Sequence, residues 1–193
     1  MPVRGTILLS TVMIFSVACG MGGADSTAPF DRQFVDMMVP HHQGAVEMAK
    51  IAQDRGEHQE IRQMAGAIIR SQEDEIGEMK AWRRTWYGSE ETPPMNKMPM
   101  VPGMEAMAGH GNGSMMDMAA DVQKLRTAPE PFDRAFIDAM IPHHQSAIDA
   151  AKAAETRAEK PEVKELARAI IADQQREIDQ MKQWRQAWYG SAG

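Results

Sequence analysis

The sequence predicts an all-α protein, a four-helix bundle built from two copies of one helical hairpin and joined by a long methionine-rich linker. Residues 132–152 repeat residues 30–50, with 13 of 21 positions identical. The similarity resumes between 65–89 and 167–191 at the same offset of 102 residues. Apolar residues recur at steps of three and four in both copies, which is the period of a helix with one buried face. Internal duplication of a helical unit is therefore the organising feature of the chain.

Each copy reads as two helices that cannot bury their apolar faces alone. The first unit covers 30–89 and the second 129–193, and together they form one domain, 30–193. Pro161 suits the first turn of a helix, while Gly88 and Gly190 suit the residue that follows a helix end. Two such hairpins bury their faces by packing against each other as a four-helix bundle.

The linker, residues 90–128, differs in composition from the rest of the chain. Its prolines and glycines predict a loop, with a short helix near 115–125. Eight methionines fall within 24 residues, with one histidine among them, and an exported loop of this kind is typical of a tract that chelates copper or silver. An oxidation buffer or plain low-complexity sequence is the alternative. The candidate linker ligands are Met95, Met98, Met100, Met104, Met107, His110, Met115, Met116 and Met118.

The N-terminus reads as an export signal. Residues 7–18 form an apolar stretch of signal-peptide length that follows Arg4 and is too short to span a bilayer comfortably. Ser16-Val17-Ala18-Cys19 resembles a bacterial lipobox, although that motif usually has leucine where Ser16 stands. We expect a signal at 1–19, lipidation of Cys19, a flexible tether at 20–29 and attachment to the membrane by the lipid alone. Ordinary secretion is the alternative, and it would leave a lone thiol in an oxidising compartment.

Composition narrows the class of partner. The chain has 193 residues and a formal net charge of −6. It has no basic block that could neutralise phosphates, so a nucleic-acid partner is not expected.

Two histidine pairs, His41–His42 and His143–His144, project from the apolar stripes of the repeated segment. Four imidazoles without partners in a core would cost a few kcal/mol, and a metal ion would satisfy them. Core histidines with ordinary hydrogen bonds are the alternative. The pairs are therefore candidate metal ligands.

Methionines near the pairs indicate which metal. Met37, Met38, Met48 and Met140 lie within one or two turns of the histidines. Thioether sulfur favours Cu(I), although methionine on an apolar stripe is more often core filler. Gln72 and Gln174 interrupt the stripes of the second helices, and they are candidates for orienting the histidines or for a solvated stripe edge.

Enzyme sites are not indicated. A di-iron or di-manganese bundle needs Glu-x-x-His motifs and further glutamates. The chain contains no Glu-x-x-His, and Glu75 and Glu177 are the only acids near the stripes. The sole cysteine belongs to the signal, so no cysteine nucleophile is available.

The segments "FDRQFVDMMVPHHQGAVEMA", "IIRSQEDEIGEMKAW" and "FDRAFIDAMIPHHQSAIDAA" resemble the bacterial domain of unknown function family 305. That resemblance covers roughly 30–190 and implies a ferritin-like bundle, in a family that includes exported copper-binding proteins of the CopM type. It implies a share in metal binding for the linker methionines. It also implies metal-binding roles for the residues of the repeated Met-x-x-His-His core, which are Met38, His41, His42, Met140, His143 and His144. Met37 corresponds to Ala139 and Met48 to Ala150, so the second site is expected to be poorer in sulfur.

These observations favour an exported protein, in the cell envelope, that sequesters or delivers Cu(I), with silver as an alternative ion and a copper transporter or chaperone as a candidate partner. A metal-free helical interaction module is the rival interpretation. A ferritin-like di-metal oxidase is less favoured.

Overall fold

The computed structural model describes residues 27–94, 101, 103 and 118–190, with the side chain of Met118 excepted. The expected signal, tether and lipidation site at Cys19 lie outside the described residues. So do most of the candidate linker ligands, namely Met95, Met98, Met100, Met104, Met107, His110, Met115 and Met116.

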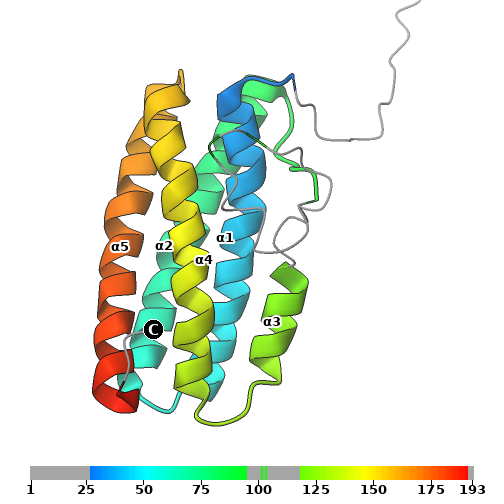
Figure 1. Cartoon of the computed structure of the whole chain (residues 1–193). Helices are drawn as coiled ribbons and strands as arrows, with labels where there is room; N and C mark the ends of the chain where they lie inside the picture. Colours follow the sequence, from blue (N-terminus) through cyan, green and yellow to red (C-terminus); the bar gives the residue numbers. More distant parts are fainter. Residues whose placement is uncertain (1–26, 95–100, 102, 104–117, 191–193) are drawn as a thin grey trace, which may run out of the picture.

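Five helices make up the described part of the chain, and none of its residues forms a strand (Figure 1). They are α1 (Phe30–Arg55), α2 (Gln59–Tyr87), α3 (Met118–Arg126), α4 (Phe132–Arg157) and α5 (Pro161–Tyr189). The all-α prediction is confirmed, with α1–α2 as the first hairpin, α4–α5 as the second and α3 as the short linker helix. None of the described helices is long and apolar enough to cross a membrane.

The two hairpins pack against each other mainly through α1 and α4. These two helices run in opposite directions, as do the helices within each hairpin (Figure 1). The N-terminal half of α1 therefore lies beside the C-terminal half of α4. Each end of the bundle consequently combines one half of the first hairpin with the opposite half of the second.

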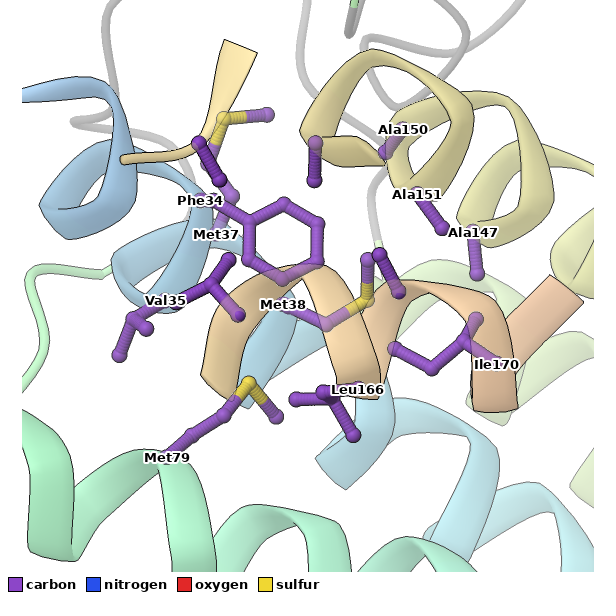
Figure 2. Packing of buried hydrophobic residues seen from close by; sticks show 14 of the residues in the cluster. Phe34, Val35, Met37, Met38, Met79, Ala147, Ala150, Ala151, Leu166 and Ile170 are labelled. Carbon is purple, nitrogen blue, oxygen red and sulfur yellow. The ribbon is translucent and has the colours of Figure 1, made fainter. Parts of the chain in front are cut away.

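The apolar core forms two clusters that follow this arrangement. The first joins the start of α1 to the end of α4 and the start of α5, as Figure 2 shows for Phe34, Met38, Ala151 and Leu166. The second joins the end of α1 and the start of α2 to the start of α4 and the end of α5. Both clusters are related by the duplication.

Buried carboxylates connect the two hairpins at both ends of the bundle. Asp31, in the first turn of α1, accepts the backbone N–H groups of Glu159 and Lys160 at 3.1 and 2.9 Å. Those amides directly precede α5, and that of Lys160, the N-cap residue, is one of the donors that a helix leaves unsatisfied. Asp133 accepts the corresponding amides before α2, from Glu57 and His58, both at 2.8 Å. Each hairpin thus caps the second helix of the other.

The helix ends follow the sequence signals. Pro161 begins α5, and Gly88 and Gly190 follow α2 and α5 in the left-handed conformation, with φ of +82° and +74°. Helices α1 and α4 continue through Pro40 and Pro142. A helical proline removes the hydrogen bond to the carbonyl four residues earlier, and the histidine pairs directly follow this weakened turn.

Two described parts of the linker pack against the bundle. Val101 is buried in the first core cluster, and Leu125 of α3 is buried in the second. Gly103 has φ of +89°, and a Cβ at this residue would lie 2.9 Å from the Cβ of Ala153 on α4. Only glycine allows this close approach without strain. The Arg55 guanidinium donates to the carbonyl oxygens of Leu125, Arg126 and Ala128, which fixes the end of α3.

Candidate metal centre

A layer of polar side chains lies in the middle of the bundle, on helix positions between the two apolar clusters. Its imidazoles are His41 and His42 from α1 and His143 and His144 from α4. All four are buried, with exposures of 0 to 3%. The structure therefore brings both predicted histidine pairs into one buried layer.

His41 and His143 meet across the α1–α4 contact. Their ring centroids are 3.8 Å apart and their planes are inclined by 37°. The Nε2 atom of His41 lies 2.9 Å from the hydroxyl of Ser146, which itself donates to the His143 carbonyl oxygen at 2.7 Å. In the first copy Gly44 stands at the position of Ser146. His143 consequently lacks the hydroxyl that His41 has.

His42 and His144 turn toward the second helix of their own hairpins. The Nε2 atom of His42 lies 2.6 Å from a carboxylate oxygen of Glu75, and His144 makes the same 2.6 Å contact with Glu177. Both pairs are 33 residues apart in sequence, so the duplication preserves the contact. These glutamates, which sequence reasoning noted only as too few for a di-metal site, are the residues that orient the outer histidines.

The two glutamines, which are candidates for orienting the histidines, lie in the same buried layer, and that role stays a prediction. Gln72 and Gln174 are buried at 2 and 3% exposure. Their side-chain oxygens have no hydrogen-bond partner among the described residues. The sequence signal that could have identified the glutamates is a repeated acid inside an apolar stripe, at a constant distance from a histidine.

The layer concentrates the unsatisfied polar atoms of the bundle. Within the described residues, nine buried side-chain nitrogen and oxygen atoms have no partner, and seven of them belong to the four histidines and two glutamines. Native interiors leave few such atoms, because each one costs roughly 1–3 kcal/mol. A concentration of unpaired imidazole nitrogens in one place indicates a binding site for an ion or for ordered water.

Burial keeps the central histidines neutral. The pKa of His41 lies well below its usual value of 6.5, mainly because burial disfavours the charged ring, and secondarily because His42 and His144 are near. The pKa of His143 is lowered for the same reason, with His41 as the first of its neighbouring charges. Neutral imidazole is the form that ligates metals.

Buried methionines lie on both sides of the layer, in equal number among the described residues. The first cluster contains Met37, Met38 and Met79, and the second contains Met48, Met140 and Met181. Antiparallel packing places Met48 of the first hairpin in the same cluster as the second hairpin's Met140. Among the described residues, each end of the bundle therefore holds three buried thioethers.

The layer approaches the surface between α2 and α5. A cleft of about 250 Å³ there is lined by Met64, Ser71, Asp173 and Glu177, among others. Because Glu177 also holds the buried ring of His144, its carboxylate connects the cleft to the histidine layer. Glu177 keeps 20% of its side chain exposed, while His144 is fully buried.

The described residues contain no group of three or more His, Cys, Asp or Glu side chains arranged to hold a metal ion. A structural zinc site would require four such ligands in a tetrahedron. The donors available here are imidazole nitrogens in the layer, two of them beside glutamate carboxylates, and thioether sulfurs in the flanking clusters. That donor set fits a soft ion better than a hard one.

Together, these features define a ferritin-like four-helix bundle with a buried histidine layer between methionine-containing cores. The chain belongs to the family described as Domain of unknown function (DUF305), whose model matches residues 31–185.

Solved structures of the same architecture include metal-bound proteins. CopM in the Cu(I)-bound form is 40% identical, with a TM-score of 0.66 over 82% of this chain and 97% of that one. CopM in the Cu(II)-bound form is 45% identical, with a TM-score of 0.68 over the same shares. A DUF305 protein from Streptomyces coelicolor, whose name describes it as secreted, is 32% identical over 80% of this chain and 91% of its own, with a TM-score of 0.66.

A shorter similarity links 51 residues of this chain to uncharacterized protein L153 of Acanthamoeba polyphaga mimivirus at 41% identity. That match covers 26% of this chain and 34% of the viral protein.

Proposed function

We propose that this protein binds copper in the buried histidine layer and serves to sequester or deliver Cu(I) in the cell envelope. The observation that carries the proposal is the layer itself, in which unpaired imidazole nitrogens lie between cores that contain buried thioethers. The similarity to CopM, which has been solved with Cu(I), Cu(II) and silver, supports copper as the ion and silver as a substitute.

The donor chemistry favours the reduced ion. Met38 and Met140 precede His42 and His144 by four residues, and both methionines are fully buried. Helical side chains lean toward the N-terminus, so each of these rings leans over the turn that carries its methionine. Imidazole together with thioether selects Cu(I) over harder divalent ions. The expected ligands are the four histidines with Met38 and Met140, and Met37 and Met48 are the further candidates on α1.

The proposal includes a role for the linker and for export. The linker methionines, with His110, would capture copper at the surface, and the buried side chains of Val101 and Leu125 attach the linker to the bundle. The N-terminal signal and the secreted relative support an exported protein, with Cys19 as the lipid anchor and a copper transporter or chaperone as the partner. Binding and transfer require no catalytic step.

An anaerobic competition titration tests the proposal. The protein without its signal would be titrated with Cu(I) against a chromophoric chelator, beside two variants. One variant replaces His41, His42, His143 and His144 by glutamine, and the other replaces every linker methionine by leucine, which conserves volume. Circular dichroism would establish that both variants remain helical.

The two variants separate the candidate sites. Loss of tight binding in the histidine variant supports the core site. Retention there, with loss in the leucine variant, would move the site to the linker and leave the histidines as structural residues. No binding in the intact protein would instead favour a metal-free helical interaction module. Turnover of a redox substrate by the loaded protein would favour the oxidase alternative.

A further inference from the structure

The hydrogen bonds around the histidine layer determine which ring nitrogen carries the proton. A carboxylate only accepts hydrogen bonds. The contacts of His42 with Glu75 and of His144 with Glu177, both through Nε2, therefore require an N–H on Nε2. In both rings the neutral form that satisfies this contact leaves Nδ1 without a hydrogen.

Ser146 imposes the same form on His41 by a different route. Its hydroxyl hydrogen is directed to the carbonyl oxygen of His143 at 2.7 Å, as serine in a helix commonly does. The hydroxyl oxygen then acts as an acceptor at 2.9 Å from Nε2 of His41. His41 is accordingly the donor, and its proton is also on Nε2.

Three Nδ1 atoms are thus left as bare acceptors inside the bundle. The Nδ1 atoms of His41, His42 and His144 are buried, and none has a hydrogen-bond partner among the described residues. We propose that these three histidines bind metal through Nδ1, and that Glu75, Glu177 and Ser146 are positioning residues that hold the proton on Nε2. The inference rests on the proposed copper site and names its ligand atoms.

The fourth histidine provides an internal comparison. Gly44 occupies the position of Ser146 in the first copy, and both ring nitrogens of His143 are buried without a partner in the described residues. Nothing in the layer selects a tautomer for His143. We expect its ring to populate both tautomers, unlike the other three.

Nitrogen NMR of the metal-free protein tests the first half of the inference. With ¹⁵N-labelled histidine at pH 8, His41, His42 and His144 should each show a protonated Nε2 and an unprotonated Nδ1, with averaged signals for His143. Gly44→Ser should move His143 to the same Nε2–H form. A proton on Nδ1 of His42 or His144, as the other tautomer or as an imidazolium, would overturn the inference.

Metal binding tests the second half. Raman spectra of the Cu(I)-loaded protein should show Nδ1-ligated imidazole, and ligation through Nε2 would overturn the inference. The Glu75→Gln/Glu177→Gln variant should bind Cu(I) about 10–100-fold more weakly, as for other residues that orient metal-ligating histidines. Glu78→Gln/Glu165→Gln changes the same charge at exposed sites on α2 and α5, and should leave affinity unchanged. Equal affinities in the two double variants would contradict the positioning role.

Failure of the copper proposal has a different signature. If the quadruple histidine variant bound Cu(I) as tightly as the intact protein, the core site would be wrong. The metal-free tautomers of His41, His42 and His144 would still be measured independently, because they depend only on Glu75, Glu177 and Ser146.

Discussion

The exchange of caps between the hairpins is tested by Asp133→Ala. The Asp133 side chain is fully buried and accepts two backbone N–H groups before α2, both at 2.8 Å. It also lies 2.6 Å from Nδ1 of His58, whose ring stacks on Trp188 of α5 at 3.8 Å between centroids. One carboxylate therefore holds the start of α2, the first turn of α4 and the end of α5 together.

The expected loss follows from these contacts. Removal of a side-chain cap costs about 0.5–2 kcal/mol. A buried donor left without an acceptor costs about 1–3 kcal/mol, and two amides are affected here, although water can reach the half-exposed His58. We expect Asp133→Ala to lower the free energy of unfolding by about 3 kcal/mol. For a domain of this size, that corresponds to a fall in Tm of about 6–12 °C.

Thermal and urea unfolding, followed by circular dichroism, would measure the loss. Asp149→Ala serves as the control, since Asp149 pairs with Lys152 at an exposed site and such pairs contribute at most about 1 kcal/mol. Asp31→Ala removes the twin cap, where Lys160 replaces His58, so the difference between the two variants reports the His58 contact. A loss below 1 kcal/mol for Asp133→Ala would refute the idea that the caps connect the hairpins.

Three further predictions concern charge and backbone conformation. The pKa values of His41 and His143 are lowered in the folded protein, so the unfolded chain takes up more protons than the folded one below pH 6.5. The free energy of unfolding should therefore fall by about 1.4 kcal/mol per pH unit for each ring, until the folded pKa is reached. In urea titrations from pH 7.5 to 5.5, the His41→Gln/His143→Gln variant should lose that slope. In the same unfolding assay, Asp36→Ala should cost about 3 kcal/mol, because the ion pair of Asp36 with Arg83 is buried. Asp138→Ala should cost about 1 kcal/mol or less, because Asp138, which pairs with Arg185, is 42% exposed. Equal losses would contradict this difference. Gly103→Ala would bring a methyl group against Ala153 of α4, so amide hydrogen exchange should become faster at residues 101 and 103 while α1 and α4 stay protected. Unchanged exchange would refute the close packing of the linker on α4.

Much of the fold was predictable because the duplication doubles every signal. The stripes of α1 and α4, the proline that begins α5 and the glycines after α2 and α5 each appear in the sequence with a local physical cause. The packing of one hairpin on the other was not predictable in the same way. Asp31 and Asp133 have the sequence context of ordinary first-turn acids. The amides that they accept from lie more than 70 residues away, and no local pattern encodes such a contact.

The residue types of the site were predictable from the sequence, but the contacts between them were not. The doubled histidine pairs indicated a shared buried function, and the structure places all four histidines in one layer. The hydrogen-bond partners of these histidines could not be predicted. Glu75 and Gln72 lie within one turn of α2 on the same stripe, and only the rotation of α2 against α1 decides which of them reaches His42. A rotation of that kind depends on side-chain packing along the whole hairpin.

The antiparallel duplication has a consequence for how copper ligands could be assembled. If each hairpin formed its own site, the loss of Met37 and Met48 equivalents in the second copy would leave it with less sulfur. The packing instead assigns Met48 of α1 to the end of the bundle that contains Met140 and Met181. Ala139 and Ala150, which stand where the first copy has Met37 and Met48, lie at opposite ends of the bundle, so each end has one thioether fewer. Because each end keeps three buried thioethers among the described residues, the two copies could diverge in sequence while the two ends stayed equal in buried sulfur. An isolated hairpin would lack the facing histidines, and the second hairpin alone would hold only Met140 and Met181 of the six buried methionines.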